Sequence, residues 1–192
     1  FTYDANVTYQ VQSTGSTRVL EEYTITGASD NRYLDAITLS TPVNDAGNIT
    51  AAYADGTPIP YTETLKTSTD QGYNYTYKEI VLKFPRKIVG RTPWDFRLSY
   101  NTDKLVDTKG AAHTFYVPAI AQTGQQSGSY VTYVSVPKDF GLPHSSGAVP
   151  TDEGTTAGRT TYSFTQQDLA KQAVALTFGN QTVYSVNFNF PL

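Results

Sequence analysis

The sequence predicts an all-β protein, because short segments rich in Thr, Val, Tyr and Phe alternate apolar and polar side chains with a period of two. Turn residues separate these segments, and only two stretches have a helical pattern. At 192 residues, the chain is long enough for a core that needs no disulfide or metal. We therefore expect an antiparallel β-sandwich followed by a smaller β-sheet subdomain, with one or two short helices.

Strands fill the expected sandwich subdomain, residues 1–101. Apolar rows at 3–11 and 19–25 flank a turn with Gly15, which predicts a hairpin. In the second row Glu21 and Glu22 point to opposite faces of the strand, so they cannot act as paired catalytic carboxylates. Further strands are expected at 37–39, 49–53, 59–65, 73–84 and 94–100, with a hairpin turn at Asp55-Gly56 and a polar loop at 66–72.

A polar segment at 102–110 has charges at helical spacing and ends at Gly110, which predicts a seam with a short helix. The second β subdomain, residues 111–192, follows it. Its strands are expected at 114–117, 130–136, 160–164, 174–178 and 183–190. Thr165 and Asp168 have the spacing of a capping box, which predicts a second short helix. The Gly/Ser/Thr/Gln-rich stretches 122–129 and 144–159 are expected to be mobile loops.

Composition excludes several classes of function. The net charge is −3 and charged residues make up 16% of the chain, which argues against a nucleic-acid partner. The most basic stretch, 83–91, is interpreted as a solvated strand end and turn. Without cysteine there is no thiol nucleophile and no thiolate metal site. The longest apolar run, 115–121, is interrupted by Pro118, so we expect no membrane segment. Because the sequence contains no methionine, we expect that it begins at Phe1 by excision or cleavage.

Few residues have the arrangement of a catalytic or metal site. The chain lacks a G-x-S-x-G nucleophile turn and an H-E-x-x-H zinc pattern. His144 falls in an expected loop, and His113 opens a strand, where a structural role is favoured. Acidic loops at 30–35, 44–48 and 152–153 do not follow the spacing of calcium loops and are interpreted as ordinary turns. We therefore predict no catalytic, cofactor-binding or metal-binding residues and no enzyme activity for this chain.

The most unusual surface feature is a tyrosine strip formed by Tyr73, Tyr75 and Tyr77. After it, the apolar positions change parity, to Ile80, Leu82 and Phe84. If the strand is continuous, one set faces the core and the other faces outward or toward a neighbouring subdomain. A bulge near Lys78 would instead bring both sets inward. Burial or packing at the seam is the favoured interpretation, and an exposed aromatic binding strip is the alternative.

Several segments of the second half carry a family resemblance. They are LSYNTDKL at 98–105, VSVPKDFGLP at 134–143, YSFTQQDL at 162–169, the turn residues FGNQ at 178–181 and the closing strand to Leu192. Together they resemble the extracytoplasmic N-terminal β region that precedes a transglutaminase-like, papain-related domain in bacterial surface proteins. In strand arrangement the chain is more distantly similar to lumenal β domains of ribophorin-type oligosaccharyltransferase subunits and to the leading β domain of some metallo-aminopeptidases.

The resemblance implies a noncatalytic, exported module whose partner is a neighbouring domain of the same chain. The catalytic Cys, His and Asp of the transglutaminase-like family would lie after residue 192. The expected role is to space, orient or recruit for that domain, outside the cytoplasm, at the cell surface or secreted. Two alternatives remain: a self-sufficient surface binding module, adhesin-like or carbohydrate-binding, that uses Tyr73, Tyr75 and Tyr77 on a cell-wall or surface ligand, and a hydrolase with an unrecognised carboxylate site. No cofactor is expected.

Overall fold

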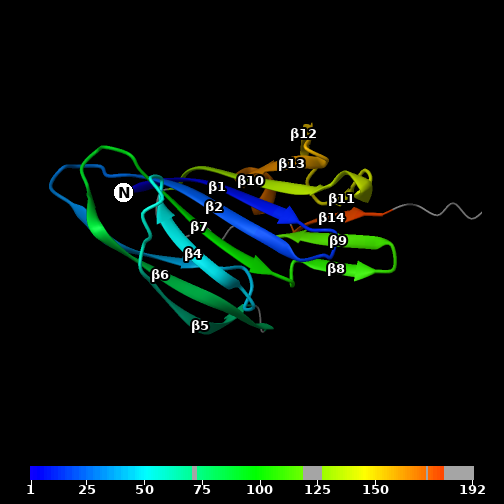
Figure 1. The fold of residues 1–192 in the computed structure, drawn as a ribbon, viewed down its shortest axis with the longest axis horizontal. Coiled ribbons are helices and arrows are strands. Elements are labelled where there is room, and N and C mark those ends of the chain that lie inside the picture. Colours follow the sequence, from blue (N-terminus) through cyan, green and yellow to red (C-terminus); the bar gives the residue numbers. More distant parts are fainter. Residues whose placement is uncertain (71–72, 119–126, 172, 180–192) are drawn as a thin grey trace, which may run out of the picture.

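A computed structural model describes residues 1–70, 73–118, 127–171 and 173–179. In these ranges the protein is built almost entirely of β-strands, which confirms the predicted all-β class. The strands form three sheets (Figure 1). No helix in the described part of the chain has the length and apolar character needed to cross a membrane.

The largest sheet has seven strands in the order β12-β13-β10-β1-β2-β7-β4. Its centre is the hairpin of β1 (Thr2–Val11) and β2 (Thr17–Thr26), as predicted from the two apolar rows. The pairing of β1 with β10 is parallel, whereas the other pairings in this sheet are antiparallel. The remaining strands are β4 (Gly47–Tyr53), β7 (Trp94–Thr102), β10 (Ser127–Pro137), β12 (Thr151–Thr156) and β13 (Arg159–Thr165).

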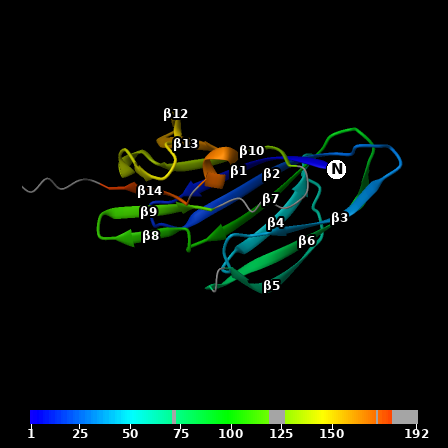
Figure 2. The same cartoon turned by 180° about the vertical axis from the view of Figure 1, so that it is seen from behind.

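Two smaller sheets pack on one face of the large sheet, toward opposite ends of the long axis (Figures 1 and 2). One contains β3 (Tyr33–Ser40), β6 (Tyr73–Val89) and β5 (Tyr61–Asp70), in that order. The other runs β11 (His144–Ser146), β14 (Val174–Phe178), β9 (Ala112–Val117), β8 (Val106–Lys109). Aromatic contacts join them to the large sheet, with ring centroids 6.1 Å apart for Tyr53 and Phe84 and 5.4 Å apart for Tyr9 and Phe115.

A single hydrophobic core fills the space between the sheets, and it contains residues from both of the expected subdomains. Because β1 and β2 lie in the same sheet as β10 and β13, the large sheet also runs across the expected division at 102–110. The opposite face of the large sheet carries exposed polar side chains such as Asn6, Glu22 and Arg97. This polar face explains the strict alternation of β1, β2 and β7, since only one side of each strand is covered.

Four local predictions are wrong. The segment 102–110 forms no helix: β7 ends there and β8 begins, because pairing of Val106–Lys109 with β9 overrides the helical spacing of the charges. Most of the expected 66–72 loop is strand, since β5 pairs with β6 as far as Asp70. The turn at Asp55-Gly56 forms, but the next strand does not pair with β4. An isolated bridge joins Ala52 and Pro58, and the chain then enters β5, which pairs with β6 in the three-stranded sheet. The 144–159 stretch contains β11 and β12.

The capping-box prediction is confirmed. Helix α1 (Gln166–Lys171) begins directly after Thr165, and a 3₁₀ turn, η1, spans Lys138–Phe140. The Asp168 carboxylate accepts hydrogen bonds from the Thr165 backbone N–H at 2.9 Å and from its hydroxyl at 2.7 Å. In the expected 122–129 loop, residues 127–129 begin β10. The rest of that loop, and the expected strand at 183–190, lie outside the described residues.

Candidate functional site

The tyrosine strip lies on β6, and the register of this strand decides which way its side chains face. Pairing between β5 and β6 is continuous from Tyr73 to Leu82, without a bulge near Lys78. Ile80 and Leu82 are fully buried. Because successive residues of a strand alternate in direction, Tyr75 and Tyr77 lie on the outer face of the three-stranded sheet. The bulge interpretation near Lys78 is therefore wrong. The register of β6 against β3 shifts farther along, between Lys83 and Ile88, which pair with Ala36 and Leu34.

Tyr75 is 50% exposed, so the favoured expectation that the strip is buried does not hold for this residue. Its ring centroid lies 5.9 Å from that of the half-buried Tyr77, with 31° between the ring planes. Beside Tyr77, Lys66 of β5 makes an ion pair with Glu79 at 3.5 Å. The Tyr73 side chain is outside the described residues. The described part of the strip is therefore an accessible aromatic pair beside an ion pair.

A second feature, which sequence reasoning did not identify as a site, is a buried carboxyl group among tyrosines. Glu21 is only 6% exposed and lies in the core row of β2. Tyr23 donates a hydrogen bond to its Oε2 at 2.6 Å, and Tyr100 of β7 donates one to its Oε1 at 3.0 Å. The available signal was its odd position between Val19 and Tyr23, since a carboxylate in a core row needs buried donors.

The electrostatics of this cluster follow from burial. Removal from water raises the pKa of Glu21, and the hydrogen bonds from Tyr23 and Tyr100 oppose that shift. Burial likewise raises the pKa of Tyr9, Tyr23 and Tyr100, and the charge of Glu21 adds to the effect. The tyrosine hydroxyls therefore keep their protons and remain donors. The cluster is a satisfied polar group inside an apolar core.

We expect stability to depend on pH through Glu21. Its pKa is higher in the folded protein than in the unfolded chain, so the folded state holds the proton more tightly. The stabilising contribution is complete below the ordinary glutamate pKa of about 4.3 and is lost as pH rises through the folded pKa. Urea unfolding of wild type and Glu21→Gln between pH 4 and 8 measures it. The wild-type stability relative to Glu21→Gln should fall with rising pH; a rise would contradict the direction of the shift.

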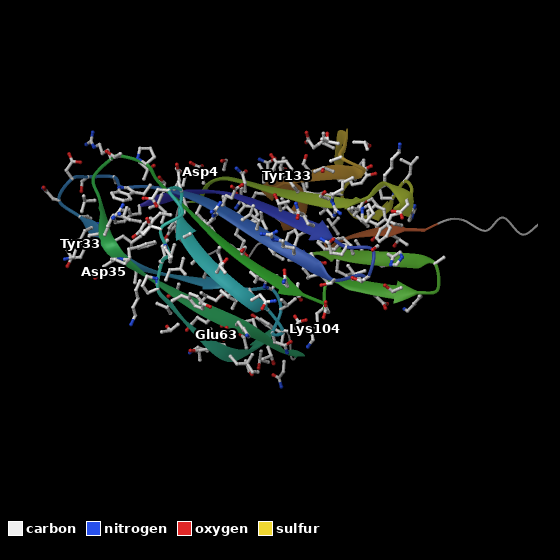
Figure 3. All side chains as sticks on the ribbon, in the orientation of Figure 1. Asp4, Tyr33, Asp35, Glu63, Lys104 and Tyr133 are labelled. Carbon is white, nitrogen blue, oxygen red and sulfur yellow. The ribbon has the colours of Figure 1, made fainter. Side chains whose placement is uncertain are left out.

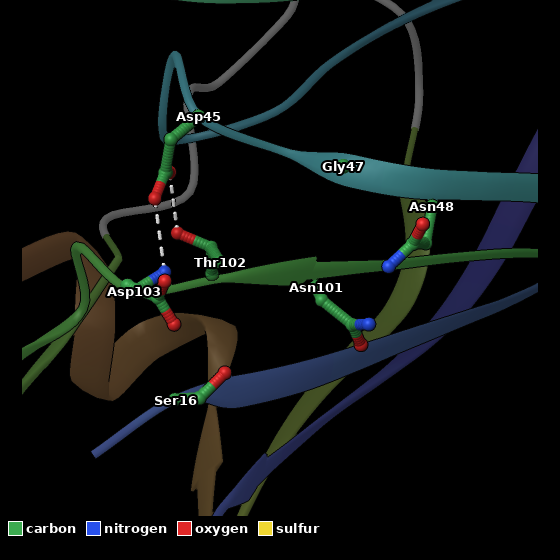
Figure 4. Close-up of a pocket in the computed structure, with 7 residues that line it drawn as sticks. All are labelled: Ser16, Asp45, Gly47, Asn48, Asn101, Thr102 and Asp103. Carbon is green, nitrogen blue, oxygen red and sulfur yellow. Dashed lines mark hydrogen bonds between the residues drawn. The ribbon is translucent and has the colours of Figure 1, made fainter. Parts of the chain in front are cut away.

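Two surface hollows are lined mainly by polar groups. The first, about 300 Å³, lies where the loop before β4 meets the end of β7 (Figure 4). There Asp45 accepts hydrogen bonds from the Thr102 hydroxyl at 2.5 Å and from the Asp103 backbone N–H at 2.9 Å. Its carboxylate therefore holds the loop to the end of β7, and residues 47–48 of the expected turn begin β4. The second hollow, about 410 Å³, lies on the uncovered face of the large sheet and includes Glu22 and Arg97.

The two histidines lie apart from these hollows. His113 of β9 stacks on Phe140 with ring centroids 4.3 Å apart, and its Nδ1 lies 3.1 Å from the Thr108 hydroxyl. His144 is not in a loop but pairs with Thr177 in the β11–β14 ladder. Within the described ranges, no group of three or more His, Cys, Asp or Glu side chains has an arrangement that could hold a metal.

Comparison with known proteins gives a likeness of fold. No family model matches the sequence, and no curated protein does. An M1 zinc metallopeptidase from Deinococcus radiodurans has a similar structure, with a TM-score of 0.50 and 14% identity over 92% of this chain. A candidate protease from Parabacteroides distasonis gives 0.49 at 13% identity over 93% of this chain and 40% of its own. A candidate nutrient-binding protein from Legionella pneumophila gives 0.47 at 12% identity, covering 93% of this chain and 65% of its own.

The share of each chain that is covered differs strongly for the metallopeptidase. Nearly all of this chain is aligned, but it spans only 41% of the metallopeptidase chain. At 14% identity the likeness concerns the fold and carries no catalytic residue across.

Proposed function

We propose that the chain is a noncatalytic accessory domain that lies beside a catalytic domain of the same protein, outside the cytoplasm, and spaces, orients or recruits for it. The observation that carries this proposal is the share of the metallopeptidase chain that the fold covers. A TM-score of 0.50 over 92% of this chain and 41% of the other means that a similar β body occurs as one part of a longer enzyme.

The packing suits a spacer. Three sheets share one core, so the sheets cannot rotate independently without exposing buried apolar area. The side chains that join them include Phe84 and Phe115, which are 4% and 1% exposed. A body of this kind holds two attachment points at a fixed separation, whereas a flexible linker does not.

The catalytic neighbour has two candidates. The segments 98–105, 134–143 and 162–169 resemble the region that precedes a transglutaminase-like domain, and the fold is similar to part of a zinc metallopeptidase chain. The coding sequence past Leu192 separates them: the first requires a Cys, His and Asp set, and the second requires an H-E-x-x-H helix. A stop codon at that point, with no catalytic domain elsewhere in the protein, would contradict the accessory role.

Deletion tests the role itself. In the full-length protein, removal of residues 1–192 should lower the stability of the catalytic domain or its kcat/KM, because the domain loses its support or its recruited substrate. The purified 1–192 fragment should be inactive on peptide and glycoside substrates. Hydrolysis by the fragment would favour the hydrolase alternative. A deletion variant that kept full activity and stability would contradict the accessory role.

A self-sufficient binding module is the second candidate, and the exposed pair of Tyr75 and Tyr77 favours it. Sugar rings stack on aromatic faces, and Thr64 and Ser68 of β5 place hydroxyl groups on the same face as the pair, with Ser68 directly opposite Tyr75. A screen against cell-wall polysaccharides tests this function. Tyr75→Ala should abolish binding, whereas Tyr116→Ala, which removes a 52% exposed tyrosine from a different sheet, should not. Equal loss in both variants would contradict a specific strip.

A further inference from the structure

One end of the long axis gathers positive charge in a protein that is acidic as a whole. The net charge of the chain is −3. At this end the loop 27–32 lies beside the turn that begins at Gly90 (Figure 3, near Tyr33 and Asp35). We call this end the basic tip. Its exposed cations are Arg32, Lys83, Arg86, Lys87 and Arg91, and its exposed acids are Asp30, Asp35 and Asp55, the last paired with Arg86 at 3.4 Å. The cations therefore outnumber the acids by two, while the rest of the molecule is acidic.

The basic tip also exposes two large apolar side chains. Tyr33 and Val89 are direct cross-strand partners on β3 and β6, and they are 55% and 47% exposed. Their neighbours in the ladder, Leu34 and Ile88, face the core, with Ile88 fully buried. The Lys87 ammonium lies 4.1 Å from the centroid of the Tyr33 ring. An aromatic ring, an aliphatic side chain and a lysine therefore share one outward surface.

The loops of the tip are held in place by backbone contacts. The Gly27 N–H donates to the Gly90 carbonyl at 3.1 Å. A Cβ atom at Gly27 would overlap that carbonyl oxygen, and one at Gly90 would lie 2.8 Å from the Asp30 carboxylate. Both glycines are buried, and Gly90 has a φ of 72°. The backbone of the two loops is therefore held together at Gly27 and Gly90.

We propose that the basic tip docks on an anionic lipid bilayer. Lys and Arg attract the negative surface of such a bilayer, at roughly 1 kcal/mol for each residue near it. Tyrosine is suited to the headgroup region because it combines an apolar ring with a polar hydroxyl. Tyr33 and Val89 would enter the headgroups while Lys87 and Arg91 contact phosphates. A soluble acidic polymer fits the charges but leaves the two exposed apolar side chains without a role. This proposal does not depend on the catalytic neighbour.

Vesicle sedimentation of the 192-residue protein tests the proposal. Binding should occur to vesicles of phosphatidylserine and phosphatidylcholine at 50 mM salt, should be weak on pure phosphatidylcholine, and should fall at 500 mM salt because the charges are screened. Lys87→Glu with Arg91→Glu should weaken binding by at least roughly 30-fold, since two attractive charges are lost. Tyr33→Ser should weaken it by about 5-fold through loss of apolar contact.

The matched control is Arg18→Glu with Lys109→Glu, which changes the net charge equally at exposed positions on β2 and β8. This variant should bind almost as well as wild type. Circular dichroism shows whether each variant remains folded. Equal loss in the control, undiminished binding of the tip variant, or equal binding to neutral vesicles would overturn the proposal. Tip-dependent binding of polyglutamate without vesicle binding would overturn it in favour of an acidic protein partner.

Discussion

Replacement of Glu21 by alanine is expected to lower the free energy of unfolding by about 3–5 kcal/mol. The hydroxyls of Tyr23 and Tyr100 both donate to Glu21, so the substitution leaves them without this acceptor. Tyr100 is only 1% exposed, so water cannot replace the carboxylate there. The substitution also leaves a cavity in the core row of β2. The lost hydrogen-bond acceptors and the cavity each cost roughly 1–3 kcal/mol, and the alanine side chain can neither accept a hydrogen bond nor fill the space. Urea denaturation followed by circular dichroism measures the change.

Two control variants test whether the lower stability of Glu21→Ala comes from the loss of the buried acceptor and side-chain volume. Glu22→Ala, at the adjacent exposed position, should change stability by less than about 0.5 kcal/mol. Glu21→Gln keeps the volume and one acceptor, so near pH 7 it should cost much less than Glu21→Ala. If Glu21→Ala were as stable as wild type, the hydrogen bonds from the two tyrosines would not be a significant part of the core.

Local patterns made the strands predictable, because alternation reports which face of a strand is covered. The β1 row from Tyr3 to Val11 and the capping pair of Thr165 and Asp168 needed no distant partner to be recognised. The parallel pairing of β1 with β10 joins residues more than 120 positions apart, and no local signal encodes it. The same limit explains the helix wrongly expected at 102–110, where a partner strand decided the structure.

The candidate sites show the same division between local and distant information. The change of parity after Tyr77 was visible in the sequence, and continuous pairing with β5 settled which set faces outward. Glu21 could be assigned to a core row, but Tyr100 lies 79 positions away and its hydroxyl was needed to explain a buried carboxyl. The basic stretch 83–91 was interpreted as a solvated strand end. The sequence did not show that this stretch lies beside Tyr33 and Arg32, because that contact depends on the pairing of β3 with β6.

Replacement of Phe115 by alanine tests whether the chain unfolds as one unit or as the two subdomains expected on either side of 102–110. Phe115 lies in the four-stranded sheet, is 1% exposed and contacts Tyr9 of the large sheet. Loss of a buried phenylalanine ring costs about 3–5 kcal/mol. The single tryptophan, Trp94, lies on β7, where its ring centroid is 6.4 Å from that of Tyr53. It therefore reports on the half of the molecule that does not contain Phe115.

Because the large sheet and the core are continuous, Phe115→Ala should shift the Trp94 fluorescence transition and the circular dichroism transition together to lower denaturant. Tyr116→Ala is the matched control, since the neighbouring side chain points outward and is 52% exposed, and it should change stability by less than about 0.5 kcal/mol. A Trp94 transition that stayed in place while the circular dichroism signal split would mean that the two halves unfold separately. Coincident transitions would mean that the core between the sheets, and not the sequence boundary at 102–110, defines the folding unit.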